Sequence, residues 1–168
     1  NCYNYVVSFE KAFKEYLGVK FAISTSSCTG ALHMGLHSLG IARGDEVILA
    51  DNNWVASVAP VVHLGAKPVF VDIEPRYFCI DPATVQAAMT PRTRAVMPVH
   101  LYGHPAAMSA LQEVCREKGI FIIEDASQAH GAALEGRLVG AWGHAGTFSF
   151  YATKNITTGE GGLVSVED

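Results

Sequence analysis

The chain has 168 residues, and 12 Lys+Arg against 16 Asp+Glu give it a formal net charge of −4. This balance argues against a basic nucleic-acid-binding protein as the default interpretation, so we expect no nucleic-acid partner. Hydrophobic residues make up 49%, and the 16 Gly and 7 Pro follow no repeat, which excludes disordered, collagen-like and low-complexity classes. A chain of this length buries ~70% of its unfolded surface, so we expect one globular domain.

The cysteines and the chain ends set the expected compartment. The four cysteines form no Cys-x-x-Cys pair, which favours neither a disulfide framework nor a zinc ribbon. No apolar run reaches the roughly 20 residues that cross a bilayer, and the start has no basic region before an apolar one. We therefore expect a cytoplasmic protein without membrane contact. Because Asn1 is not an initiator Met and residues 163–166 have the pattern of a strand, we also expect a fragment.

Seven short apolar or β-branched runs predict strands at 21–24, 47–50, 68–71, 95–99, 120–123, 147–150 and 163–166. Most of these runs lack polar alternation, as expected for strands covered on both faces. Helical patterns lie between them, at 8–17, 29–39, 53–63, 81–89 and 106–118. Residues 131–146 are a glycine-punctuated loop expected outside the sheet. The order predicts a layered α/β fold with a mainly parallel sheet.

Open α/β sheets bind ligands beyond the carboxyl ends of their strands, so polar residues after apolar runs are candidate site residues. Such residues occur at 26–29, 52–54, 124–125 and 149–154. The first group leads into a helix whose free N–H groups favour an anion such as phosphate, although Ser26 or Ser27 could simply cap that helix. The sequence has no Gly-x-Gly-x-x-Gly and no P-loop, which argues against dinucleotide and nucleotide triphosphate sites.

Asp125 and Lys154 are the candidate reactive groups. Asp125 comes with Glu124 after the four apolar residues 120–123 and is expected at the floor of a cleft, where an unpaired carboxylate is costly. Its partner is either a salt-bridging or capping group or the protonated nitrogen of a heteroaromatic ring, and metal ligation is disfavoured because no second ligand has suitable spacing. Lys154 is the candidate nucleophile, with the Ser149 hydroxyl nearby to hold an anion. An ordinary surface lysine is the alternative.

Trp54 and two histidine pairs are further candidates. Trp54 follows a predicted strand and belongs either to the core or to a flat platform for an aromatic ligand. The pairs His33/His37 and His100/His104 have four-residue spacing. The first pair lies in a predicted helix without nearby acids and the second lies in a predicted loop. We therefore expect no metal site at either pair.

Together these places match the needs of one cofactor, pyridoxal 5'-phosphate (PLP). PLP needs an amine for covalent attachment, an anion cradle, a ring platform, and a carboxylate that keeps its pyridine nitrogen protonated. The residues that would supply these are, in the same order, Lys154, Cys28 and Thr29 with Ser149, Trp54, and Asp125.

The sequence also resembles the DegT/DnrJ/StrS family, the fold type I PLP-dependent nucleotide-sugar aminotransferases. The matching stretches are 44–48, 65–72, 98–103, 124–132 (EDASQAHGA) and 148–162. The resemblance implies that residues 1–168 are the PLP-binding large domain, a three-layer α/β/α fold with a mostly parallel seven-stranded sheet. It also implies that the family's first segment and its C-terminal small domain are absent from this chain.

The resemblance assigns a role to each matching position. It implies that Lys154 attaches the cofactor and moves protons, and that Asp125 binds the pyridine nitrogen. Gln128 would contact the ring hydroxyl, and Ser127 would lie at the ring face opposite Trp54. The phosphate would be held by Ser149 and by the backbone of Cys28 and Thr29.

The implied reaction moves an amino group from an amino acid, commonly glutamate, to a keto sugar carried on a nucleotide. The resemblance also implies a homodimer and a role in making cell-surface polysaccharide or antibiotic sugars. Lys154 favours transamination over dehydration, because the family's dehydratase branch has His at this position. A truncated, non-catalytic remnant and a PLP-dependent sugar dehydratase are the alternatives.

Overall fold

A computed structural model describes residues 2–167, which form a seven-stranded sheet in the order β1-β9-β8-β5-β4-β2-β3. β9 is antiparallel to both of its neighbours, and every other neighbouring pair is parallel. The strands are β1 Phe21–Thr25, β2 Glu46–Ala50, β3 Lys67–Val71, β4 Thr93–Met97, β5 Phe121–Asp125, β8 Ala145–Ser149 and β9 Gly162–Val166. The predicted mostly parallel seven-stranded sheet is confirmed.

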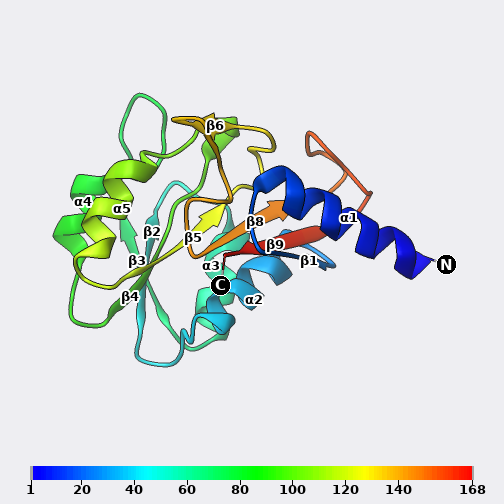
Figure 1. Ribbon diagram of the computed structural model, residues 1–168. Coiled ribbons are helices and arrows are strands. Elements are labelled where there is room, and N and C mark those ends of the chain that lie inside the picture. The colour runs from blue at the N-terminus through cyan, green and yellow to red at the C-terminus, as the bar shows by residue number, and fades with distance from the viewer. Residues whose placement is uncertain (1, 168) are drawn as a thin grey trace.

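Helices cover both faces of this sheet (Figure 1). They are α1 Cys2–Leu17, α2 Cys28–Ser38, α3 Val55–His63, α4 Pro82–Ala88 and α5 Met108–Arg116, with a short 3-10 turn at Leu101–Gly103. No helix among residues 2–167 has the length and apolarity to span a bilayer.

Alternate residues of the central strands pack into different core clusters, as the two-residue period of a strand requires. Val47 and Leu49 of β2 share a cluster with Leu36 of α2, whereas Ile48 shares one with Leu111 of α5. A third cluster joins Phe13 of α1 to the aromatic rings at the end of β8. The predicted three layers are therefore confirmed.

Some element boundaries differ from those predicted. α1 begins at Cys2 rather than residue 8, because its first turns expose tyrosines and valines and so show no buried apolar stripe. β5 extends to Asp125, and β8 begins at Ala145, inside the predicted loop. That loop lies otherwise outside the main sheet, as predicted, but it forms an unpredicted hairpin of β6 Ala133–Leu134 and β7 Arg137–Leu138.

The chain after this hairpin crosses β8 with direct contact between backbones. A Cβ added at Gly146 of β8 would overlap the carbonyl oxygen of Gly140, and Gly140 itself has a positive φ of 83°. Glycine is therefore required at both positions: at Gly146 because there is no room for a side chain, and at Gly140 because other residues adopt a positive φ only at a cost. This close crossing holds the segment around 140–143 against the end of β5.

We predict that Gly146→Ala lowers the free energy of unfolding by about 3 kcal/mol, because backbone atoms cannot rotate away from the added methyl group. Gly35→Ala is the matched control, since its added methyl would lie 3.5 Å from the Ala145 Cβ, an ordinary contact. That control should raise the unfolding free energy by up to about 1 kcal/mol through helix propensity. Urea unfolding of both variants measures the difference, and equal midpoints would show that the crossing is not tight.

Candidate active site

A cleft of about 550 Å³ lies at the edge of the sheet where β1, β5 and β8 end and β9 begins. This is the edge at which open α/β sheets bind ligands. The structure brings every predicted site residue to this one cleft: Cys28, Thr29, Trp54, Asp125, Ser127, Gln128, Ser149 and Lys154. The cleft is also lined by residues to which the sequence analysis assigned no role, among them Leu32, Ala56, Glu160 and Gly161.

The start of α2 forms one end of the cleft. Ser27 is the N-cap, and its hydroxyl and carbonyl oxygens accept the N–H groups of Gly30 and Ala31 at 3.2 and 3.0 Å. The capping alternative is therefore correct. Within the described part of the chain, this cap leaves the N–H groups of Cys28 and Thr29 without a partner at the cleft. Two free donors at a helix N-terminus suit an anion, so the cap and an anion cradle are compatible.

Cys28 lies beneath this cradle as a packed, protonated side chain. Burial raises the pKa of its thiol strongly, and the negative charge of Asp125 raises it further. A thiol in this state is a poor nucleophile. A side chain at Gly162 would come within 2.6 Å of the Cys28 nitrogen, so β9 approaches the cradle closely.

Asp125 is the last residue of β5 and is 4% exposed at the floor of the cleft. One carboxylate oxygen accepts the Ser57 hydroxyl at 2.7 Å, and the other accepts the Ser127 N–H at 3.1 Å. No Lys, Arg or His in the range 2–167 forms an ion pair with it. The salt-bridge alternative is therefore wrong for the described chain. The capping alternative holds in part, because the contact with the Ser127 N–H is a local turn of the kind that a capping carboxylate makes.

Trp54 lies at the rim of the cleft, 74% exposed. It precedes α3, and its N–H donates to the Asn53 side chain at 2.7 Å. The alternative that Trp54 belongs to the core is wrong. A large aromatic side chain that is exposed beside a cleft is suited to contact a flat ligand.

Ser149 ends β8, and the segment that returns to β9 includes Lys154. The Lys154 amine has no hydrogen bond or ion pair to residues 2–167. Burial lowers the pKa of His130, and the positive charge of Lys154 lowers it further, so this imidazole is neutral at neutral pH. The Lys154 side chain is half-buried, and because its amine has no partner among residues 2–167 it is available to a ligand.

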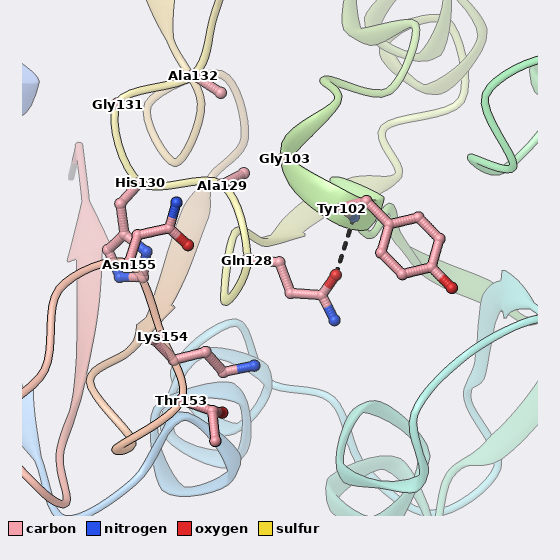
Figure 2. A pocket seen from close by; sticks show the side chains of 10 residues that line it. All are labelled: Tyr102, Gly103, Gln128, Ala129, His130, Gly131, Ala132, Thr153, Lys154 and Asn155. Atoms are coloured by element: carbon pink, nitrogen blue, oxygen red, sulfur yellow. Dashed lines mark hydrogen bonds between the residues drawn. The ribbon is translucent and has the colours of Figure 1, made fainter.

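A second hollow of about 640 Å³ adjoins the cleft and shares Gln128, Thr153 and Lys154 with it (Figure 2). The Gln128 side-chain oxygen accepts the Tyr102 N–H at 2.9 Å. Because a backbone N–H can only donate, this contact fixes the amide orientation and leaves the Gln128 NH₂ group as a donor. In Figure 2 that NH₂ group and the Lys154 amine extend into the same open space.

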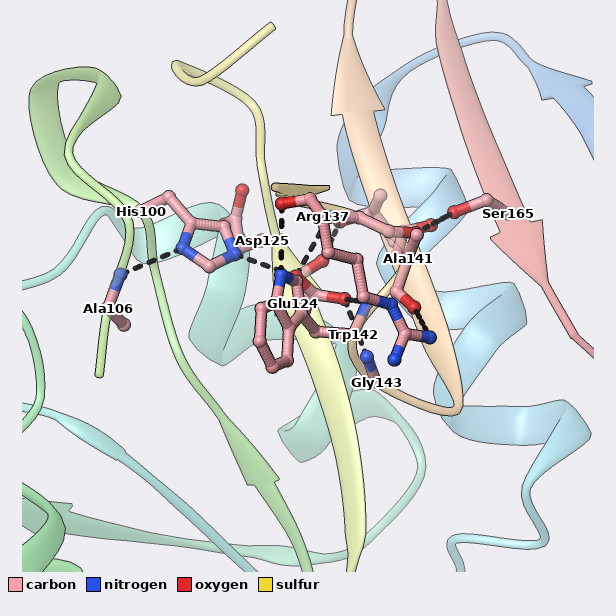
Figure 3. Close-up of polar contacts among 12 residues, drawn as sticks. His100, Ala106, Glu124, Asp125, Arg137, Ala141, Trp142, Gly143 and Ser165 are labelled. Atoms are coloured by element: carbon pink, nitrogen blue, oxygen red, sulfur yellow. Dashed lines mark hydrogen bonds and ion pairs between the residues drawn. The ribbon is translucent and has the colours of Figure 1, made fainter. Parts of the chain in front are cut away.

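Glu124, next to Asp125, is fully buried and has a different role, in a hydrogen-bond network with His100 and the segment 140–143 (Figure 3). One of its oxygens accepts Trp142 N–H and Gly143 N–H at 2.7 and 2.6 Å. The other accepts Gly140 N–H at 2.8 Å and contacts the His100 Nε2 at 2.9 Å. The Ala106 N–H donates to the His100 Nδ1 at 3.0 Å, so the imidazole proton lies on Nε2 and is donated to Glu124.

One member of the His100/His104 pair, His100, belongs to this network, whereas the His104 ring stacks on Tyr77 with ring centroids 3.9 Å apart. His100 bonds to Glu124 rather than to a metal, and His33 and His37 have stacked rings 6.5 Å apart. Among the described residues no group of three or more His, Cys, Asp or Glu side chains could hold a metal ion.

Sequence reasoning missed Ser57 and the network of Glu124. Ser57 is the one hydroxyl residue in α3, VASVAPVVH, and an isolated hydroxyl on an apolar helix is a signal for a buried partner. The donors to Glu124 come from two segments distant from it in sequence, His100 and residues 140–143, and no local pattern indicates them.

The chain is similar to several known proteins in sequence and in structure. It is 48% identical over 164 residues to GDP-perosamine synthase of Caulobacter vibrioides, which covers 98% of this chain and 44% of that protein. It is 45% identical over 160 residues to L-glutamine:2-deoxy-scyllo-inosose aminotransferase of Streptomyces kanamyceticus, covering 95% and 38%. An aminotransferase structure from Psychrobacter cryohalolentis has a TM-score of 0.95 at 40% identity, covering 97% and 42%. NtdA from Bacillus subtilis with bound cofactor PMP has a TM-score of 0.92 at 36% identity, covering 98% and 37%.

The sheet order is that of the fold type I PLP-dependent aminotransferases, whose solved structures the chain matches with TM-scores of 0.95 and 0.92. The family model of the DegT/DnrJ/EryC1/StrS aminotransferases matches residues 1–168, and the chain belongs to that family. The chain spans less than half the length of the relatives just described.

We predict that Glu124→Gln lowers the free energy of unfolding by about 3 kcal/mol or more, because the amide NH₂ would face N–H donors that a carboxylate oxygen now accepts. Glu113→Gln, an exposed glutamate of α5, is the control and should change stability little. Chemical unfolding measures both. A Glu124→Gln midpoint equal to that of the control would show that these hydrogen bonds contribute nothing net.

Proposed function

We propose that this chain is the cofactor-binding domain of a PLP-dependent aminotransferase that moves an amino group from glutamate to a nucleotide-linked keto sugar. One observation supports this most directly: a buried acid, Asp125, and an unpaired amine, Lys154, line the same cleft as a helix start with free N–H groups. Membership of the aminotransferase family supports the same reaction class.

The lining residues fit PLP by their chemistry. The Cys28 and Thr29 N–H groups and the Ser149 hydroxyl would bind the phosphate. The Asp125 carboxylate would accept a hydrogen bond from the protonated ring nitrogen. When bound, PLP supplies an electron sink for bond breaking beside the transferred nitrogen.

The remaining groups would orient the ring and move protons. Trp54 and Ser127 would contact its two faces, and the Gln128 NH₂ group would donate to the ring hydroxyl. Lys154 would attach the cofactor through Nζ, and the same nitrogen, once released, would take and return a proton at the reacting carbon.

The second hollow is suited to the sugar. Lys154 is its one charged lining residue, and Tyr102, Gln128, Thr153 and Asn155 offer neutral donors and acceptors. Such groups suit the hydroxyls of a sugar or cyclitol ring. The relatives include both a GDP-perosamine synthase and an L-glutamine:2-deoxy-scyllo-inosose aminotransferase, so the acceptor distinguishes members of this family.

We further propose that residues 1–168 correspond to the large domain alone and that the whole protein is a homodimer. The cleft rim exposes Trp54 and Tyr151, side chains that a second copy would cover.

We predict that the chain mixed with PLP develops a visible absorption band that borohydride removes, because the reagent reduces the bond to Lys154. Lys154→Ala should lack this band. Lys118→Ala, which changes an exposed lysine in the turn after α5, should keep it. Identical spectra for the wild type and Lys154→Ala would refute the role of Lys154.

Turnover distinguishes the alternatives. With glutamate and a set of nucleotide-linked keto sugars, the proposed enzyme releases 2-oxoglutarate and yields an amino sugar. A non-catalytic remnant releases none, and a dehydratase yields a sugar that has lost a hydroxyl without gaining nitrogen. Glutamine and keto cyclitols belong in the same assay, since the name of one relative specifies both.

A further inference from the structure

The inner face of α3 contains one polar side chain. Ser57, Pro60 and Val61 are the buried residues of this helix, and Ser57 is 1% exposed. Pro60 and Val61 follow Ser57 at the spacing of one helical face. Alanine would satisfy packing at this position, so the buried hydroxyl requires another explanation.

The Ser57 hydroxyl donates its hydrogen bond to a residue outside its own helix. A serine inside a helix ordinarily donates to a carbonyl of the preceding turn, as Ser38 of α2 does to Gly35 at 2.9 Å. Ser57 instead donates to the Asp125 Oδ2 at 2.7 Å, across 68 positions of sequence. Both side chains are buried.

This contact determines how the Asp125 carboxylate is turned. Within the described chain its only other donor is the Ser127 N–H, which contacts the other oxygen at 3.1 Å. A carboxylate with one hydrogen-bond donor on each oxygen cannot rotate about its Cβ–Cγ bond without breaking both hydrogen bonds. Each oxygen keeps a second lone pair, so a ligand N–H can still be accepted.

The same turn of α3 adjoins the ring platform. The Ser57 N–H donates to the Trp54 carbonyl oxygen at 3.0 Å. Ser57 therefore bonds to the Trp54 carbonyl through its backbone N–H and to the Asp125 carboxylate through its hydroxyl. A shift of this turn would move the platform and the acid together.

We propose that Ser57 is a positioning residue: its hydroxyl aims the Asp125 carboxylate at the ring nitrogen of PLP and couples this acid to the Trp54 platform. This role rests on the proposed function, because it needs PLP in the cleft. Ser57 touches neither cofactor nor substrate and acts through Asp125.

The first measurement uses the cofactor-free chain. The side-chain carboxyl ¹³C resonance of Asp125, assigned by its loss in Asp125→Asn, should shift in Ser57→Ala and return toward the wild-type position in Ser57→Thr, which restores the hydroxyl. Ser38→Ala, which removes a hydroxyl bonded within its own helix, should leave the resonance unchanged.

The second measurement uses PLP labelled with ¹⁵N at the ring nitrogen. Ser57→Ala should weaken PLP binding about tenfold, the effect of losing one hydrogen bond to a charged group. The bound ¹⁵N resonance should move toward that of unprotonated pyridine. Ser57→Thr should restore both values, and Ser38→Ala should match the wild type.

The outcomes separate the two proposals. A wild-type chain without the Lys154-dependent band overturns the proposed function and this role with it. A normal band, with PLP affinity and both resonances unchanged in Ser57→Ala, overturns the role of Ser57 alone. If Ser57→Ala does not fold, Ser57→Cys keeps the volume with a weaker donor, and wild-type values in that variant would equally overturn the role.

Discussion

The carboxyl end of β5 depends on how one buried charge is satisfied. Glu124 has no solvent exposure, and a carboxylate in that position is tolerated only when its oxygens are fully hydrogen-bonded. Its donors come from the segment after the β6–β7 hairpin and from His100. Both segments are therefore fixed to β5, and the His100 segment includes the Tyr102 N–H that orients Gln128. A structural acid outside the cleft thus sets the geometry of a residue inside it.

The two acids at this strand end serve different layers because neighbouring side chains of a strand point to opposite faces. Glu124 contacts Trp142, which belongs to the cluster beneath α4 and α5. Asp125 contacts Ser57 of α3, on the other face. The pair Glu-Asp therefore joins both helical layers to the site through adjacent residues. A one-residue slip of β5 would exchange the environments of the two carboxylates and leave each without its donors.

The sequence predicted those parts of the site that follow a local rule. Asp125 and Lys154 were identifiable because polar groups after apolar runs mark the ligand edge of a parallel sheet. The sheet and its layers followed from unbroken β-branched runs. Gln128 was indicated by the family resemblance alone and Ser57 was missed. Both are set by contacts with residues distant in sequence, Tyr102 and Asp125, and periodicity gives no information about such pairs. The start of α1 was missed because its tyrosines and valines face outward.

The left-handed backbone at Tyr102 separates two tasks that one residue performs. Its φ of 53° turns the N–H toward Gln128, while its side chain is 82% exposed beside the second hollow. The amide contact does not depend on side-chain identity, so this position can change without releasing Gln128, most readily to Asn or Gly, which accept a positive φ. Position 102 is thereby a natural place for diversification: laboratory libraries or evolution could remodel what enters the hollow while Gln128 keeps its orientation.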